Sequence, residues 1–219
     1  MFNLGLYFVT IAIWGSTWII TKQQVSELSP LHSVFLRYVL AAFLLQSLIK
    51  IFGSKAQYSA KTHLLFFLLG SSLFCWNYVL FYHAASTGLT TGLIALIFST
   101  IITMNIANNA LIFKEYPKLS TVIGAIIGLF GITLVFFEDL SNFKDTNLLS
   151  SIALCLIATY LASLGNMFSK ILQRKNVTVV SANQWGMTYG ALSLLITTLF
   201  FDQNIQIPVT ISFLPGSNI

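Results

Sequence analysis

Charged side chains are scarce in this sequence. They make up 8% of the 219 residues, whereas soluble domains carry roughly 25%. Hydrophobic residues make up 56%, and the mean hydropathy is +0.83. This composition indicates an integral membrane protein. The net charge of +5 comes from Lys and Arg residues scattered singly between apolar runs, so no basic patch points to nucleic acid as a partner.

Residues with reactive side chains are also few. Cys75 and Cys155 both lie in apolar stretches, which gives no disulfide framework and no cysteine metal site. No Asp or Glu falls inside a long apolar run, so the usual proton carriers and intramembrane catalytic acids are missing there. Zinc-protease, Gly-x-Ser-x-Gly and phosphate-loop motifs are absent, and His32, His63 and His83 occur singly near run ends. We therefore expect that the protein is not an enzyme and that it binds no metal and no cofactor.

Long apolar runs dominate the chain instead. A helix needs about 20 mostly apolar residues to cross the hydrocarbon core, where its backbone must form hydrogen bonds internally. Seven runs meet this requirement, so we expect an all-α integral membrane protein with seven transmembrane helices. The runs cover residues 4–21, 31–49, 63–82, 89–113, 119–137, 147–169 and 179–201.

Basic residues between the runs gather on one side. Eight of the eleven follow the second, fourth and sixth runs: Lys50, Lys55, Lys61, Lys114, Lys118, Lys170, Arg174 and Lys175. Five of the six acids lie on the other side, and only Glu115 lies among the basic connections. The positive-inside rule makes the basic side cytoplasmic. We therefore expect a cytoplasmic N-terminus and a short external tail at 202–219.

A weak internal repeat relates the two ends of the chain. An offset of 148 residues aligns Lys22 with Lys170 and Arg37 with Trp185 without a gap. The offset contains five runs, an odd number, so the second copy would enter the membrane from the opposite face. We expect a complete five-helix unit at 1–138 and the first two helices of an inverted repeat at 146–201, which would make the chain an incomplete form.

Aromatic and polar residues at membrane depth are the first candidates for a binding site. Arg37 is the one charged residue inside a run, where its burial costs about 3 kcal/mol. It either meets an anionic or carbonyl group of a solute, or it bonds to helix carbonyls or snorkels. Trp14 lies near the centre of the first run, and a glycine, Ser16 and Thr17 follow it. The helix either opens there, or Trp14 and Trp18 form a packing ridge.

Amide side chains complete the candidate site. Asn105, Asn108 and Asn109 share one helix face, which either bonds to neighbouring helices or lines a cavity. Asn77 lies among Trp and Tyr residues, which are expected at a membrane interface. The interface does not account for an amide at this position. A Gln-Trp pair in the seventh run allows the same two interpretations. The predicted substrate-binding residues are Trp14, Ser16, Thr17, Trp18, Arg37, Asn77, Asn105, Asn108, Asn109, Gln184 and Trp185.

Two glycine patterns have the spacing of close helix contacts. Gly124-x-x-x-Gly128, extended by Gly131, places small residues on one face of the fifth run, and Gly186-x-x-x-Gly190 does so in the seventh. Small residues allow neighbouring helix backbones to approach closely in a membrane. We expect both faces to pack against another helix.

Several short motifs occur in a familiar order. They are Trp14-Gly15-Ser16-Thr17-Trp18, Ser29-Pro30 leading to Arg37, Phe81-Tyr82-His83-Ala84-Ala85 before Gly88, and Lys114-Glu115 before Gly124, Gly128 and Gly131. Together they resemble the EamA-type drug/metabolite transporters. The resemblance implies a ten-span carrier of two inverted five-helix halves that moves small metabolites or amino acids across the bacterial inner membrane, often outward. The chain departs from the family pattern at Ser99-Thr100-Ile101, where a proline is usual, and in lacking spans eight to ten.

The prediction is therefore a multi-pass inner-membrane transporter whose partners are a small-molecule solute and the lipid bilayer, with export as the expected direction. A homodimer could complete the bundle. The alternative is a non-transporting membrane subunit or remnant of a truncated transporter gene. A photosensor is disfavoured because the run at 179–201 contains no lysine for a retinal Schiff base.

Overall fold

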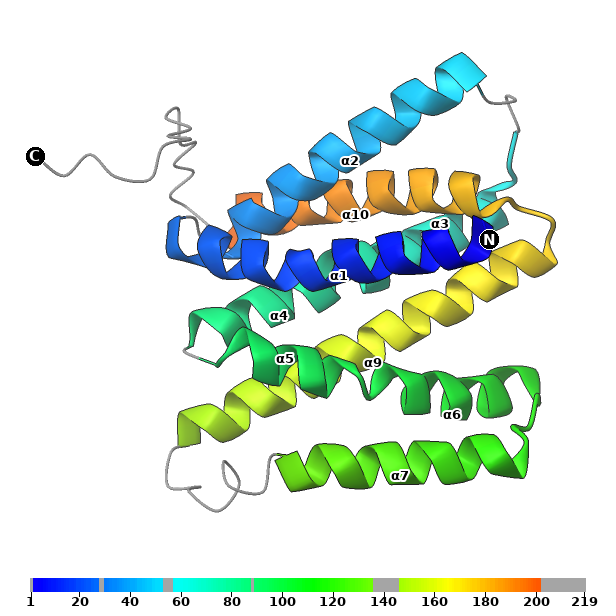
Figure 1. Ribbon diagram of the computed structural model, residues 1–219. Helices are drawn as coiled ribbons and strands as arrows, with labels where there is room; N and C mark the ends of the chain where they lie inside the picture. Colours follow the sequence, from blue (N-terminus) through cyan, green and yellow to red (C-terminus); the bar gives the residue numbers. More distant parts are fainter. Residues whose placement is uncertain (1, 28–29, 53–56, 88, 136–145, 202–219) are drawn as a thin grey trace, which may run out of the picture.

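Helices make up all of the regular structure that can be described. The computed structural model describes residues 2–27, 30–52, 57–87, 89–135 and 146–201, and no strand occurs within them (Figure 1). This confirms the all-α class. The helices are α1 (Phe2–Glu27), α2 (Pro30–Phe52), α3 (Ala60–Leu69), the π-helical η1 (Gly70–Trp76), α4 (Asn77–Ser86), α5 (Thr91–Phe98), α6 (Ile101–Phe113), α7 (Leu119–Val135), α9 (Thr146–Arg174) and α10 (Val179–Phe201).

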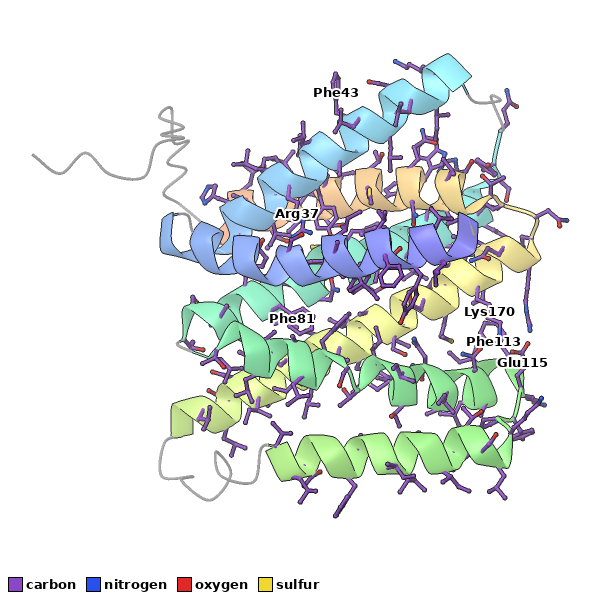
Figure 2. The ribbon with its side chains drawn as sticks, viewed as in Figure 1. Arg37, Phe43, Phe81, Phe113, Glu115 and Lys170 are labelled. Atoms are coloured by element: carbon purple, nitrogen blue, oxygen red, sulfur yellow. The ribbon has the colours of Figure 1, made fainter. Side chains whose placement is uncertain are left out.

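Three stretches are long and apolar enough to cross a membrane: Ala60–Ser86, Gly92–Phe113 and Leu148–Arg174. Leu4–Ser16 and Leu119–Val135 are shorter apolar helices. The large apolar side chain of Phe43 is exposed on the outside of the bundle (Figure 2). Leu111 is exposed as well. Exposed apolar surface of this extent belongs in lipid. The chain is therefore a multi-pass helical membrane protein, and the count of seven spans stays a prediction.

Two of the predicted spans are irregular helices. The third runs as α3, η1 and α4 without interruption, with a π-helical middle. The fourth is divided into α5 and α6 by a turn at Ser99 and Thr100. Their hydroxyls bond back to the carbonyls of Leu96 and Ile97, at 2.6 and 2.7 Å. Such back-bonding often bends helices. The break between α5 and α6 lies at the position where a proline is usual in the family that the sequence resembles.

The helices lie side by side, with α2 at one edge of the bundle and α7 at the opposite edge (Figure 1). The α3–η1–α4 rod is central, because α10 packs on α3 and η1 while α9 packs on α3, η1 and α4. One buried cluster joins α2, the rod and α10 around Phe66, Phe74 and Leu194. A second joins α4, α5 and α9 around Phe81 and Ile94. The segment from 146 to 201 thus supplies helices to both cores.

The glycine face of α10 makes the closest helix crossing. A Cβ placed on Gly70 of η1 would lie 2.3 Å from the carbonyl oxygen of Gly186 and 2.8 Å from the nitrogen of Gly190. Backbone therefore meets backbone, which confirms the packing role predicted for Gly186 and Gly190.

The corresponding prediction for α7 was wrong. Beyond the backbone of α7 itself, no described atom lies within 4 Å of the position that a Cβ would take at Gly124, Gly128 or Gly131. The helix lies at the edge of the bundle, so its glycine face meets no neighbour within the described ranges (Figure 1). The spacing of small residues permits a close contact, but it does not supply the partner.

Candidate functional site

One cationic group lies among tyrosines between α2 and α4. The guanidinium carbon of Arg37 is 5.1 Å from the ring centroid of Tyr78, and Tyr82 is a hydrogen-bonding partner of Arg37. Tyr38 packs edge-on against Tyr78, with 5.3 Å between ring centroids. Tyr38 and Tyr82 are buried, whereas Arg37 and Tyr78 are half-buried. We call these four residues the Arg37 cluster.

The charge of Arg37 has no carboxylate partner in the described part of the chain. Glu115 is the one acid whose side chain is described, and it bonds to Lys170 and Arg174 in the connection after α6. The described residues also offer Arg37 no bond to a helix carbonyl. A half-buried guanidinium without a counter-charge favours an incoming anion, because charge-assisted hydrogen bonds are the strong ones. Both interpretations of Arg37, contact with a solute and a purely structural role, stay predictions.

Asn77 lies next to this cluster in the chain, at the junction of η1 and α4. Its side chain is 2% exposed, and its Oδ1 atom has no hydrogen-bond partner within the described residues. Leaving a buried polar group unpaired costs about 1–3 kcal/mol. A π-helical segment directly before it is a frequent feature of functional sites. Asn77 therefore stays a candidate.

The three asparagines of α6 face α9 and form an interhelical network with it, which we call the asparagine ladder. Asn108 Nδ2 donates to Ser163 Oγ at 2.8 Å, and Ser163 Oγ donates to Asn105 Oδ1 at 2.8 Å. Asn105 Oδ1 also accepts from Asn166 Nδ2 at 3.4 Å, and Asn109 Oδ1 accepts from Lys170 Nζ at 2.6 Å. The amide face thus bonds to a neighbouring helix in this structure. A role in substrate binding stays a prediction for these residues.

The residues of α1 lie in another part of the bundle. Trp14 stacks on Phe98 of α5, with 5.8 Å between ring centroids, and Phe98 meets Phe81 of α4 at 5.4 Å. Ser16 Oγ donates to the carbonyl of Ile13 within an unbroken α1. A local opening of α1 is therefore not found in this structure, and the ridge of Trp14 and Trp18 stays a prediction. The side chains of Thr17 and Trp18 lie outside the described residues.

Gln184 and Trp185 of α10 take part in two separate contacts. Gln184 is buried and donates to Gln46 of α2. Trp185 meets His63 of α3 edge to face, with 4.7 Å between ring centroids. Arg37 lies nine residues from Gln46 along α2, about 13 Å at 1.5 Å per residue. The structure therefore does not bring Arg37 and Trp185 to the same level of the bundle.

Sequence reasoning missed the surroundings of His63. Trp185 and Tyr189 are one turn apart on α10, and Tyr189 Oη lies 3.0 Å from His63 Nδ1. A lone histidine near a span end carries no signal by itself. The aromatic pair one turn apart in the seventh run was the available hint, but its partner helix was unknown.

Sequence reasoning also missed a charged cluster where α6 ends. The Nζ atom of Lys170 and the guanidinium carbon of Arg174 lie 4.6 and 4.3 Å from the ring centroid of Phe113. Both cations also bond to Glu115. Lys114 ends α6 in the left-handed conformation, with φ of 58°. Figure 2 shows Phe113, Glu115 and Lys170 together at one end of the bundle.

This cluster should respond to acid. The hydrogen bond from Lys170 and the charges of Lys170 and Arg174 lower the pKa of Glu115. A carboxyl whose pKa is lowered on folding contributes stability above its unfolded pKa, about 4.3 for Glu, and loses it as pH falls through the folded value. We expect Glu115→Gln to lower the melting temperature slightly at pH 7 and to have no effect in strong acid.

Melting temperatures of the purified Glu115→Gln variant and the unmodified protein, measured from pH 7 to strong acid, would test this. Lys118→Gln is the matched control, since Lys118 is an exposed residue of the same connection. The difference in melting temperature between Lys118→Gln and the unmodified protein should not shrink on acidification. A Glu115→Gln effect that stayed constant down to acid pH would contradict the prediction.

Within the described ranges, no three His, Cys, Asp or Glu side chains are grouped so that they could hold a metal ion. The fold is that of a multi-pass α-helical membrane protein with polar groups held between its helices. The chain belongs to the EamA-like transporter family, whose profile matches residues 2–137. It is 29% identical over 205 residues to the uncharacterized transporter YoaV of Bacillus subtilis (strain 168). The aligned region covers 91% of this chain and 67% of that protein. No solved structure matches.

These comparisons confirm the resemblance drawn from the sequence. Membership of a transporter family, together with a relative named as a transporter, points to a membrane transporter rather than an enzyme.

Proposed function

We propose that this protein carries small metabolites or amino acids that bear an anionic group out of a bacterial cell across the inner membrane. The observation that carries the proposal is the half-buried Arg37, held over Tyr78 without a carboxylate partner among the described residues. A carboxylate is the natural partner of a guanidinium because the planar fork matches two oxygens. Tyr78 and Tyr82 would then flank the carboxylate and supply apolar contact beside the charge.

The helix boundaries support the proposed repeat. Shifting α2 by 148 residues gives 178–200, and α10 spans Val179–Phe201. The same shift moves α1 to 150–175, and α9 spans Thr146–Arg174. A five-helix unit at 1–138, two helices of an inverted repeat at 146–201 and seven spans with a cytoplasmic N-terminus are therefore part of the proposal. In inverted-repeat carriers the substrate lies near the midplane between the halves, and α2 contacts α10.

The test is flux in reconstituted vesicles. Vesicles loaded with an unlabelled amino acid should accumulate the labelled form by counterflow. Counterflow of the corresponding amine, which lacks the carboxylate, should be weak. Absence of counterflow for every carboxylate tested, with the protein shown to be folded, would refute the proposal. In cells, single cysteines placed at Lys61 and Lys118 should react only with membrane-permeant reagents if both connections are cytoplasmic.

A further inference from the structure

His63 lies in a cage of aromatic side chains that come from three segments of the chain. The ring centroid of His63 is 4.7 Å from that of Trp185 and 6.0 Å from that of Tyr189, both on α10. Phe66 lies one turn further along α3, at 5.6 Å, and Tyr58 closes the cage at 6.5 Å. All four rings stand at 75–88° to the imidazole. His63 is thus held edge to face on several sides.

A polar contact also joins His63 to α10. Tyr189 Oη lies 3.0 Å from His63 Nδ1. A neutral imidazole can accept the tyrosine proton at Nδ1, whereas an imidazolium must donate to the tyrosine oxygen. Protonation therefore reverses this hydrogen bond without removing either partner. Aromatic faces also attract a cation, so the cage can hold the charged form.

Few other charged groups face His63. The segment Val179–Phe201 of α10 contains no Asp, Glu, Lys or Arg, and η1 contains none either. On α3 itself Lys61 is exposed. On α9, Lys170 and Arg174 bond to Glu115, and Lys175 is exposed. Tyr58 and Tyr189 are the titratable side chains in contact with His63, and no contact between His63 and a carboxylate occurs among the described residues.

We propose that His63 binds a proton in step with the transport cycle. The proposal rests on the function proposed above, in which α3 belongs to the first repeat and α10 to the second. Alternating access moves one repeat against the other, and in the proposed cycle this movement opens and closes the contact between His63 and Tyr189. An imidazole that alternates between the cage and water changes its affinity for a proton, and by linkage the proton then biases the movement. A proton site of this kind needs no acid within the spans.

Fluorescence of Trp185 reports this proton directly. The protein has four tryptophans, so a variant with Trp14, Trp18 and Trp76 replaced by Phe keeps only the indole that touches His63. Because an imidazolium quenches a neighbouring indole, stepwise acidification should lower the emission in one step if His63 takes up a proton. Adding His63→Gln, which retains a hydrogen-bonding amide, should remove the step. His83→Gln, an exposed residue of α4, should leave it in place.

Flux in otherwise unmodified protein tests the coupling. A pH gradient across the vesicle should stimulate wild-type transport, whereas His63→Gln should lose the stimulation and keep counterflow at equal pH on both sides. A fluorescence step that survives His63→Gln, or gradient stimulation that survives it, would overturn the inference. If the wild type shows no counterflow at all, the proposed function fails instead, and the fluorescence titration alone decides whether His63 binds a proton.

Discussion

Replacing Arg37 with methionine should raise the solute concentration needed for half-maximal transport roughly ten- to hundredfold, since a hydrogen bond to a charged group contributes about 1.5–3 kcal/mol. The same change should not lower thermal stability. Arg37 has no counter-charge among the described residues, and an unpaired charge costs free energy wherever it is shielded from water. Loss of function with unchanged or increased melting temperature is the signature of a binding residue. Parallel flux and melting measurements would detect it.

Conservative variants separate the charge from its geometry. Arg37→Lys keeps the charge but loses the planar fork, so transport should fall between that of the wild type and Arg37→Met. Tyr78→Phe keeps the ring below the guanidinium and should change affinity little. Lys50→Ala, which removes an exposed charge in the last turn of the same helix, is the matched control. A melting temperature that fell with Arg37→Met as far as transport did would assign Arg37 to structure instead.

Replacing Gly70 with alanine should destabilise the protein strongly. The added methyl group would lie 2.3 Å from the carbonyl oxygen of Gly186, and a Cβ on Gly190 would in turn lie 3.0 Å from the carbonyl oxygen of Gly70. Neither helix can relieve this by turning a side chain, because the atoms in conflict are backbone. Overpacking costs about 1–3 kcal/mol where side chains can adjust, so we expect the upper end of that range or more. Thermal unfolding in detergent would measure the loss.

Gly128 on α7 provides a control of the same chemistry. It is also a helical glycine in a small-residue pattern, but no described atom from another segment lies within 4 Å of the position of its missing Cβ. Alanine is the better helix former by about 1 kcal/mol, so Gly128→Ala should leave stability unchanged or slightly increased. Equal melting temperatures for Gly70→Ala and the wild type would show that α10 does not cross η1 as closely as described.

Properties that depend on local periodicity were predictable from the sequence. Apolar runs of membrane length predicted an all-α membrane protein, because lipid requires the backbone to bond within each segment. The spacing of Asn105, Asn108 and Asn109 placed all three on one face, because residues three and four apart are neighbours on any α-helix. The glycine spacing in the seventh run predicted a close crossing for the same reason.

The partner of each face was decided by the tertiary structure. The asparagines meet Ser163 and Asn166 of α9, whereas the sequence was equally consistent with a cavity. His63 and Glu115 acquired their surroundings from α10 and α9, more than fifty residues away along the chain.

The sequence by itself therefore determined that this chain forms apolar helices, which side chains share a helix face, and that one arginine lies within an apolar run. Only the tertiary structure decided that Arg37 rests on Tyr78, that Gly70 admits the backbone of α10, and that the similar glycines of α7 face no neighbour among the described segments. The physical reason is that lipid is as apolar as the helices it surrounds, so hydrophobicity places helices in the membrane without choosing their neighbours. Shape and hydrogen bonds between distant segments make that choice.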